Sequence, residues 1–359
     1  MITPAARTRA AALREAFAAR GALPVEPPIL QDAGTLLDLY GEDIRARAYV
    51  TSDAARGEQM LRPDFTVPVV QMHIEAGASP ARYTYAGEVF RRQDAHPDRP
   101  SEYLQVGFEL IGGTDPAADD AEVFALIAEA VAPLSLRAST GDIGILMAAV
   151  HGLRTTEARR AALARHIWRP RRFRALLDRF SGRTPVPAAR AALLADVEPL
   201  RGAKPMIGLR SLDEINDRIT TLHADARARP LSNEEVDLIT ALLDVRETVP
   251  YALARLRDLA MDMPAIAEAV DGLEARTEAL GARGIDTASL DFEASYGRTS
   301  MEYYDGFVFG FSAPGRADLP PVASGGRYDA LTARLGGQAI PAVGAVLRPG
   351  LMTELEGAA

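Results

Sequence analysis

The sequence predicts an α+β protein in which a β-rich region is divided by a helical insertion. Two runs rich in aromatic and branched residues, 82–90 and 103–112, flank a polar stretch with prolines, as the strands of a hairpin do. Ala, Leu and Arg at helical spacing then dominate residues 142–284. Strand-like sequence returns afterwards, at 289–295, 306–312 and 339–347.

We therefore expect a discontinuous core made of residues 1–140 and 285–359, with residues 141–284 inserted as a helical unit. The chain has 359 residues, of which 48% are hydrophobic, and this is enough to bury a large domain and a smaller one.

Helical and extended segments alternate before the insertion. Ala10, Leu13 and Phe17 share one face of a helix over residues 1–20, and Gly21 follows as a C-cap glycine does. Pro27 and Pro28 make the next stretch extended. The sequence predicts, in order, an extended segment at 24–30, a helical turn at 34–40, a strand at 48–51, a helix at 68–76, the hairpin, a helix at 119–132 and a strand at 134–139.

The insertion has almost no strand-like sequence, and Ser232 with Glu235 resembles a capping box at the start of one helix. The helices expected here cover 143–151, 157–167, 188–197, 232–247, 250–259 and 264–282. A further helix is expected at 328–335, among the returning strands.

Composition excludes several classes of function. The chain has no cysteine, which removes disulfides, thiolate nucleophiles and cysteine-ligated zinc, and its five histidines show no metal-ligand spacing. We therefore expect no metal and no cofactor. A net charge of −9 argues against broad affinity for nucleic acid, and no apolar run approaches the length of a membrane span. Glu15 argues against a transit peptide, so we expect a cytoplasmic protein.

Polar side chains in the hairpin suggest a binding site. Arg91 ends the first run, and its guanidinium suits a carboxylate or phosphate, although the local sequence alone favours a surface salt bridge. Gln105 and Glu109 are four residues apart on one strand, so both face the same side of the sheet. They require polar partners there, either a ligand or a structural hydrogen-bond network.

Two further segments carry side chains with more than one interpretation. Tyr303 and Tyr304 are expected in a strand, where paired tyrosines usually belong to the core. The two glycines before Arg327 usually indicate a tight turn.

Taken in order, the segments LRPDFT (61–66), YAGEVFRRQ to FELIGG (85–113), and EYYDGFVFGF to SGGRYDAL (302–331) resemble the catalytic core of histidyl-tRNA synthetases. That resemblance covers about residues 1–140 and 285–350. It implies the class II synthetase fold, an antiparallel sheet flanked by helices, and a pocket for histidine. The residues that it implies for the pocket are Asp64, Thr66 and Gln105 at the amino group, Arg91 at the carboxylate or an ATP phosphate, Glu109 and Tyr304 at the imidazole, Tyr303 beside them, and Tyr328 closing the pocket.

The chain departs from that pattern where the synthetases bind ATP. Thr299 stands where the resemblance places a catalytic arginine, and Leu351 stands where it places a second one. Arg348 comes three residues early and is followed by a Pro-Gly pair that disfavours a helix. Charge on a transferring group needs cations at fixed positions, so no catalytic residue is expected. Asp64 also replaces the more usual glutamate, and the anticodon-binding domain is expected to be absent.

A histidine pocket without an ATP clamp resembles the regulatory subunits of ATP phosphoribosyltransferase. This resemblance implies a non-catalytic protein that activates a short catalytic subunit and transmits inhibition by histidine, in the first step of histidine biosynthesis. It also implies a hetero-octamer with that catalytic subunit, and self-association as a dimer around residues 27–30. A reduced synthetase that activates histidine with ATP is the alternative from another class.

The stretch 154–183 is unusually basic, with ten arginines against Glu157 and Asp178, a net of +8. A solvated surface, contact with an acidic partner subunit and contact with RNA all remain open as its role.

Overall fold

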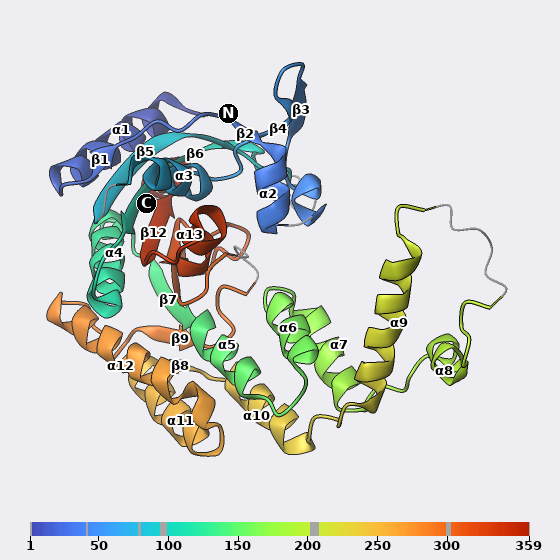
Figure 1. Cartoon of the computed structure of the whole chain (residues 1–359). Helices are drawn as coiled ribbons and strands as arrows, with labels where there is room; N and C mark the ends of the chain where they lie inside the picture. The colour runs from blue at the N-terminus through green and yellow to red at the C-terminus, as the bar shows by residue number, and fades with distance from the viewer. Residues whose placement is uncertain are drawn as a thin grey trace.

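The computed structural model describes residues 2–40, 42–77, 80–93, 99–201, 208–298 and 303–358. Its centre is a nine-stranded sheet with the order β1-β5-β6-β12-β11-β10-β7-β9-β8 (Figure 1). A small sheet, β2-β4-β3, lies beside it. The strands are β1 (Leu23–Pro24), β2 (Leu30–Asp32), β3 (Val50–Asp53), β4 (Gly57–Leu61), β5 (Ala81–Phe90), β6 (Glu102–Ile111), β7 (Arg137–Asp142), β8 (Arg246–Thr248), β9 (Asp291–Glu293), β10 (Phe307–Ser312), β11 (Ala323–Arg327) and β12 (Ala342–Leu347).

Helices surround the large sheet and form the region between β7 and β9. They are α1 (Pro4–Ala19), α2 (Ala33–Tyr40), η1 (Glu42–Ala46), α3 (Thr66–Ala76), α4 (Pro116–Val131), α5 (Ile143–Gly152), α6 (Glu157–Arg165), α7 (Pro170–Phe180), α8 (Ala188–Ala195), α9 (Leu212–Arg227), α10 (Asn233–Leu243), α11 (Val249–Asp262), η2 (Pro264–Ile266), α12 (Ala267–Ala282), α13 (Asp329–Gly336) and α14 (Pro349–Ala358).

The predicted α+β class is confirmed, with one refinement of the sheet. Neighbouring strands from β5 through β6, β12, β11 and β10 to β7 are all antiparallel. The sheet is mixed overall, because β1 pairs with β5 and β9 pairs with β7 in parallel. The hairpin predicted from the two aromatic runs is the β5–β6 pair.

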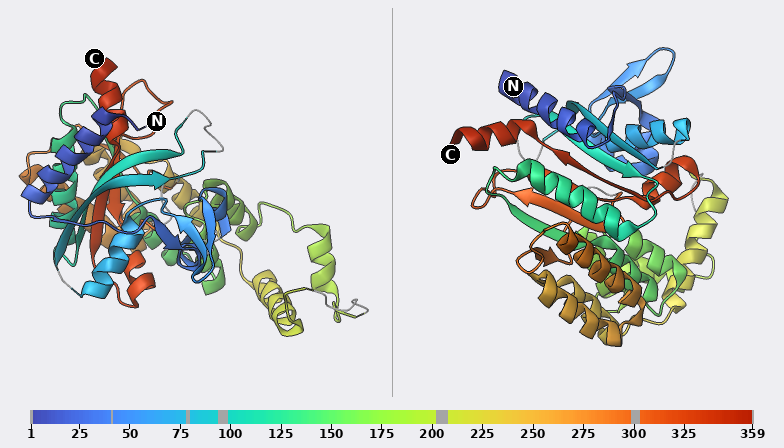
Figure 2. Two further views of the ribbon diagram at one scale, coloured as in Figure 1. Left: turned by 90° about the horizontal axis from the view of Figure 1, so that it is seen from above. Right: turned by 90° about the vertical axis from the view of Figure 1, so that its left-hand side faces the viewer.

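One face of the large sheet is covered by helices α1, α4, α12 and α14, which Figure 2 shows lying across it in the right-hand view. Phe17 of α1 packs edge-on against Phe108 of β6, and Phe124 of α4 contacts the rings of Phe309 and Phe311 on β10. Because successive side chains of a strand alternate between faces, Glu109 projects to the opposite face from Phe108. That opposite face, next to α3 and α13, holds the polar residues of the hairpin.

Several expectations about individual elements are wrong. The glycines before Arg327 do not form a tight turn, since Gly325 and Gly326 lie within β11, between β10 and β12. The strand expected at 134–139 is β7, which begins at Arg137. A helix, α14, does follow Arg348, because Pro349 occupies its first position, where a missing N–H costs nothing. Strands β4, β8 and β11 and helices α7 and α9 were not expected.

The missed helix α7 lies in the arginine-rich stretch. Phe173, Leu177 and Phe180 are buried at helical spacing on it, between arginines that dominate the composition. Part of this basic charge is neutralised within the chain, because Arg159 and Arg179 pair with Asp225 of α9 and Arg183 pairs with Asp237.

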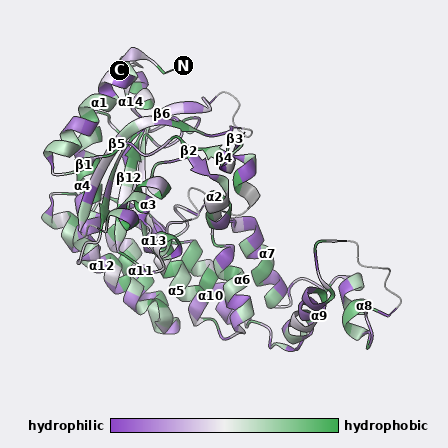
Figure 3. Cartoon of the chain, turned by 45° about the horizontal axis from the view of Figure 1, so that its top comes forward, coloured by the Kyte–Doolittle hydropathy of each residue, from purple (hydrophilic) through white to green (hydrophobic). Residues whose placement is uncertain are grey.

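Helices α8 and α9 project away from the rest of the molecule (Figures 1 and 2). Neither has a buried residue among those that the structure describes, and Figure 3 shows that hydrophilic residues make up much of α9. In contrast, β8 joins the edge of the large sheet through β9, so the inserted region is tied to the core. The division of the chain at residues 140 and 285 stays a prediction.

Within the described residues, no helix combines the length and the apolar character that crossing a bilayer requires. The same part of the chain contains no group of three acidic or histidine side chains arranged to hold a metal ion.

Candidate functional site

The candidate site is a buried polar cluster on the face of the sheet opposite α1 and α4. Four parts of the chain supply it: the turn from β4 into α3, strands β5 and β6, the segment before β10, and the residue between β11 and α13. Glu109 of β6 lies at its centre and is 1% exposed.

Three hydroxyl groups donate hydrogen bonds to the Glu109 carboxylate. Tyr85 Oη donates to Oε1 at 2.7 Å, and Thr66 Oγ1 donates to the same oxygen at 3.1 Å. Tyr328 Oη donates to Oε2 at 2.5 Å. These donors come from β5, from the first residue of α3 and from the residue that precedes α13. The structure thus brings two of the predicted residues, Thr66 and Tyr328, directly to a third.

Burial dominates the electrostatics of this cluster. Removal from water raises the pKa of Glu109 to about 7, an effect that the three hydroxyl donors oppose and that nearby Asp64 reinforces. Burial and the charge of Glu109 also raise the pKa of Tyr85, Tyr304 and Tyr328, so all three phenols stay protonated at neutral pH. The cluster therefore offers one titratable carboxyl group inside a ring of neutral donors.

Strand glycines make room for these side chains. A Cβ atom at Gly344, which pairs with Glu109 across β12, would lie 1.5 Å from Glu109 Oε2. One at Gly107 would lie 2.2 Å from Tyr85 Oη, and one at Gly326 would lie 2.8 Å from the Tyr304 ring. The floor of the cluster is thus built from backbone. Gly326 is a glycine because a side chain at this position of β11 would overlap the Tyr304 ring.

Gln105 lies on the same face of β6 as Glu109, as predicted, and is 1% exposed. Its Oε1 atom has no hydrogen-bond partner among the described residues. An unmatched buried acceptor costs about 1–3 kcal/mol. A ligand ammonium group would satisfy it, whereas Glu109 already accepts from three protein hydroxyls and has room for one further donor.

Asp64 and Arg91 border the cluster. Asp64 Oδ1 accepts a hydrogen bond from Val67 N at 3.4 Å in the first turn of α3, and Arg91 Nε donates to the Pro63 carbonyl at 2.6 Å. The Arg91 charge also acts on Tyr304, whose pKa it lowers against the larger effect of burial. Both predicted residues are therefore close to the tyrosine segment.

Tyr303 and Tyr304 precede β10 and lie outside any strand, so the expectation of a strand there is wrong. Both are buried, and their ring centroids are 4.9 Å apart. Tyr303 also contacts the Tyr328 ring edge-on at 5.9 Å. Asp305 joins the two segments, since its carboxylate accepts from the backbone N–H groups of Asp329 and Ala330.

Sequence reasoning missed Tyr85, although it lies inside the quoted hairpin motif. Its ring stacks on Phe65 at 4.3 Å, and its hydroxyl reaches Glu109. Tyr83 shares this face of β5 and even pairs with Glu109 across the strands, but its hydroxyl bonds to His73, whereas that of Tyr85 reaches Glu109.

The structure describes only one of the two positions at which the resemblance places an ATP-binding arginine. Thr299 lies outside the described residues. Leu351 lies in α14 and packs against the core. Arg348, just before α14, donates to the Pro321 carbonyl and lies over the Tyr103 ring at 5.9 Å. Burial lowers the pKa of Arg348, and nearby Arg91 lowers it further.

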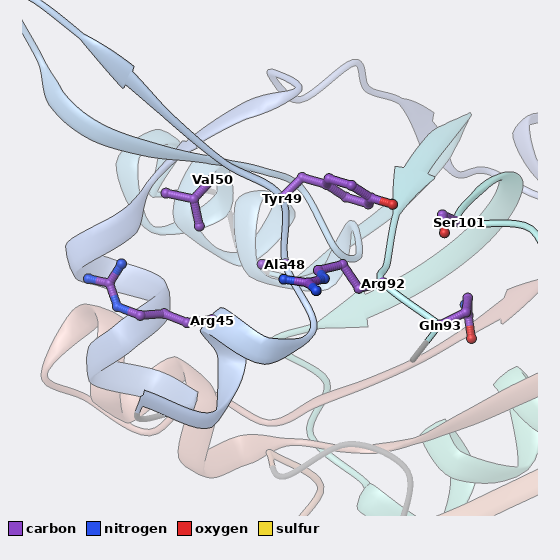
Figure 4. Close-up of a pocket in the computed structure, with 7 residues that line it drawn as sticks. All are labelled: Arg45, Ala48, Tyr49, Val50, Arg92, Gln93 and Ser101. Atoms are coloured by element: carbon purple, nitrogen blue, oxygen red, sulfur yellow. The ribbon is translucent and has the colours of Figure 1, made fainter. Parts of the chain in front are cut away.

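A separate hollow of about 700 Å³ lies beside the hairpin (Figure 4). None of the eight predicted site residues lines it, and Arg45 on its wall forms a bidentate ion pair with Glu58. The residues that line it are Arg45, Ala48, Tyr49, Val50, Arg92, Gln93 and Ser101.

Comparison with protein families matches this chain to the histidyl-tRNA synthetase family over residues 3–211 and 210–350. A protein of Brucella anthropi named ATP phosphoribosyltransferase regulatory subunit is 34% identical over 92% of this chain and 93% of its own length. A protein of Brucella ovis with the same name is 33% identical over 93% of each chain.

Solved structures show the same fold. A protein of Bacillus halodurans described as ATP phosphoribosyltransferase regulatory subunit/histidyl-tRNA synthetase superposes with a TM-score of 0.68 at 22% identity, over 98% of this chain and 79% of that one. The histidyl-tRNA synthetase of Nostoc sp. PCC 7120 gives a TM-score of 0.65 at 16% identity, over 98% and 72%.

Proposed function

The chain belongs to the ATP phosphoribosyltransferase regulatory subunits, within the histidyl-tRNA synthetase family, and from this premise we propose its role. It is a non-catalytic subunit that a short catalytic subunit requires for activity, and it transmits feedback inhibition by histidine. The reaction is the first step of histidine biosynthesis, and the complex acts in the cytoplasm.

The observation that carries the proposal is a buried polar cluster around Glu109 combined with an apolar residue, Leu351, at an expected ATP position. A transferring phosphoryl or adenylyl group needs cations aimed at its developing charge. A leucine packed on the core cannot supply one.

The Glu109 cluster has the chemistry that an imidazole and an ammonium group require. Glu109 offers an acceptor for an imidazole N–H, while the Gln105 amide and Asp64 offer acceptors for the amino group. Arg91 lies where it can meet a carboxylate, with the tyrosine rings beside it. Free histidine is the ligand that uses all of these groups together.

One observation favours the second candidate, a reduced synthetase that activates histidine with ATP. Arg348 lies close enough to Arg91 for the two charges to interact, next to the Tyr103 ring. Two cations beside an aromatic ring suit a nucleotide phosphate and base. However, Arg348 is already bonded to the Pro321 carbonyl.

Reconstitution distinguishes the two. With a short catalytic subunit and this protein together, ATP and phosphoribosyl pyrophosphate should give phosphoribosyl-ATP, and added histidine should inhibit the reaction. Either subunit alone should be inactive. Alone, this protein should not catalyse histidine-dependent exchange of pyrophosphate into ATP. Exchange at a rate typical of synthetases, with no activation of the catalytic subunit, would establish the second candidate instead.

Assembly is the remaining part of the proposal. Ile29, Leu30, Tyr49 and Val50 are each about 40% exposed and belong to the small sheet or the residues next to it. Leu30 and Tyr49 flank Leu61 on one face of the small sheet, whereas Val50 pairs with Met60 and projects to the other face. Exposed apolar side chains such as Ile29 and Leu30 favour burial against another protein. Pairing of two copies through Ile29 and Leu30 gives the isologous dimer expected around residues 27–30, and dimers with catalytic subunits give the hetero-octamer.

A further inference from the structure

Arg298 is an arginine of the core whose side chain enters the inserted helical region. It follows β9 by five residues and precedes Tyr303 of the pocket by five. Gly297 directs it there, because this glycine has φ +83°, and a Cβ atom on it would lie 2.9 Å from Val308 on β10. The chain at this point is thus fixed against the sheet on one side.

The guanidinium contacts two residues of the insertion. Arg298 Nε donates to the carbonyl of Ile167 at 2.8 Å, in the turn between α6 and α7. Its Cζ atom lies 4.9 Å from the ring centre of Phe173, a buried residue of α7. The side chain therefore spans the boundary between the pocket segment and the α6–α7 pair.

This contact is difficult to explain as a stabilising one. Arg298 is 5% exposed, and it forms no ion pair with a carboxylate among the described residues. Its Nη2 atom has no hydrogen-bond partner in that part of the chain. Burial, together with the charge of Arg174, lowers the pKa of Arg298 to about 10. An apolar residue of similar length would fill the space without a desolvated charge.

We propose that Arg298 is a positioning residue that couples the tyrosine segment of the pocket to the α6–α7 pair. Arg298 and the tyrosine segment are connected through β10 and β11, because a Cβ atom at Gly326 would lie 2.8 Å from the Tyr304 ring and 3.0 Å from Val308, the residue against which Gly297 packs. A ligand that shifts Tyr304 therefore shifts the residue that holds Ile167 and Phe173, and the reverse also applies. Coupling of this kind is reciprocal, so loosening the link weakens ligand affinity by the same factor as it weakens the response of α6–α7. The identity of the ligand, histidine, rests on the proposed function.

Two buried arginines provide a matched comparison. Arg159 is 7% exposed, donates from Nε to Asp225 of α9 and lies 4.9 Å over the Phe180 ring. It therefore resembles Arg298 in burial and packing, but its contacts with Asp225, Arg229 and Phe180 lie within the insertion. Both Arg298→Met and Arg159→Met remove a buried guanidinium group. The first removes a contact between the core and the insertion, and the second removes a contact within the insertion.

Histidine affinity by titration calorimetry and thermal unfolding should separate the two variants. Arg298→Met should weaken histidine binding about tenfold, within the usual range of coupling between sites, with an unfolding temperature equal to or above wild type. Arg159→Met should lower the unfolding temperature and leave histidine affinity unchanged. Equal loss of affinity in both variants, or unchanged affinity in Arg298→Met, would overturn the proposal.

Hydrogen exchange tests the link even if histidine is not the ligand. Without any ligand, Arg298→Met should speed exchange of the amides around Tyr303 and Tyr304 as well as those of α7, and Arg159→Met should affect the insertion alone. In wild type, saturating histidine should slow exchange in α7, and Arg298→Met should abolish this effect. A wild type that does not bind histidine refutes the proposed ligand, whereas unchanged exchange at Tyr303 and Tyr304 in Arg298→Met refutes the coupling.

Discussion

Replacing Glu109 by glutamine should remove a pH dependence from the stability of this protein. The carboxyl group is fully buried, and burial raises its pKa to about 7. In the unfolded chain its pKa is near 4.3. At pH values between about 4.3 and about 7, Glu109 therefore carries a proton in the folded state but has lost it in the unfolded state. Protonation of Glu109 therefore adds stability at low pH, and this contribution is lost as the pH rises towards 7.

The size of the effect follows from the shift in pKa. One pH unit inside this window corresponds to about 1.4 kcal/mol for a single group. Raising the pH from 6 to 8 should therefore reduce the free energy of unfolding by roughly 1.4 kcal/mol through Glu109 alone. Lower pH is avoided because the sequence isoelectric point is about 5.2, where association is favoured. Glutamine keeps the shape of the side chain. Its carbonyl oxygen can accept from Tyr85 and Thr66 at the position of Oε1, and its amide N–H can donate to the Tyr328 hydroxyl at the position of Oε2.

The assay is urea unfolding of wild type and Glu109→Gln at pH 6 and pH 8. Asp305, whose pKa burial raises to about 6, contributes in the same direction to both proteins, so the difference between the two pH dependences isolates Glu109. The wild type should lose about 1.4 kcal/mol more than the variant. An identical pH dependence in both would show that Glu109 is ionised throughout, and the reasoning about its burial would be wrong.

The remaining predictions concern the floor of the pocket, a buried ion-pair network and assembly. Gly344→Ala should abolish histidine binding because its methyl group overlaps Glu109 Oε2, whereas Gly272→Ala, in α12 with open space around it, should raise stability by about 1 kcal/mol; calorimetry and urea unfolding measure both. Asp120→Ala should destabilise the fold by about 3–5 kcal/mol in urea, because it leaves the buried guanidinium groups of Arg276 and Arg327 without their shared carboxylate. Asp318→Ala, which breaks an exposed pair with Arg316, is the control and should have no measurable effect. Light scattering should show a dimer of 38.5 kDa chains that Leu30→Glu converts to monomer, and a monomer in the wild type at all concentrations would refute the exposed residues Ile29 and Leu30 as an interface.

The sequence alone determined what depends on local spacing. The alternation of a strand placed Gln105 and Glu109 on one face of β6, and the helical spacing of Ala10, Leu13 and Phe17 gave the buried face of α1. Motifs in a fixed order also indicated the family, which the comparisons confirm.

Only the tertiary structure decided which distant groups meet. The three donors to Glu109 are 24, 43 and 219 residues away along the chain. Gly344 could not be linked to Glu109 before the strands were paired in register. Register alone would have favoured Tyr83 over Tyr85, and only side-chain packing shows that Tyr83 bonds to His73 while Tyr85 bonds to Glu109. The sequence did not indicate a partner for Arg298, which follows a glycine with positive φ and meets the Ile167 carbonyl of the insertion. Local spacing fixes the face on which a side chain projects, but the partner it meets depends on strand order and packing, which arise from contacts between residues far apart in the sequence.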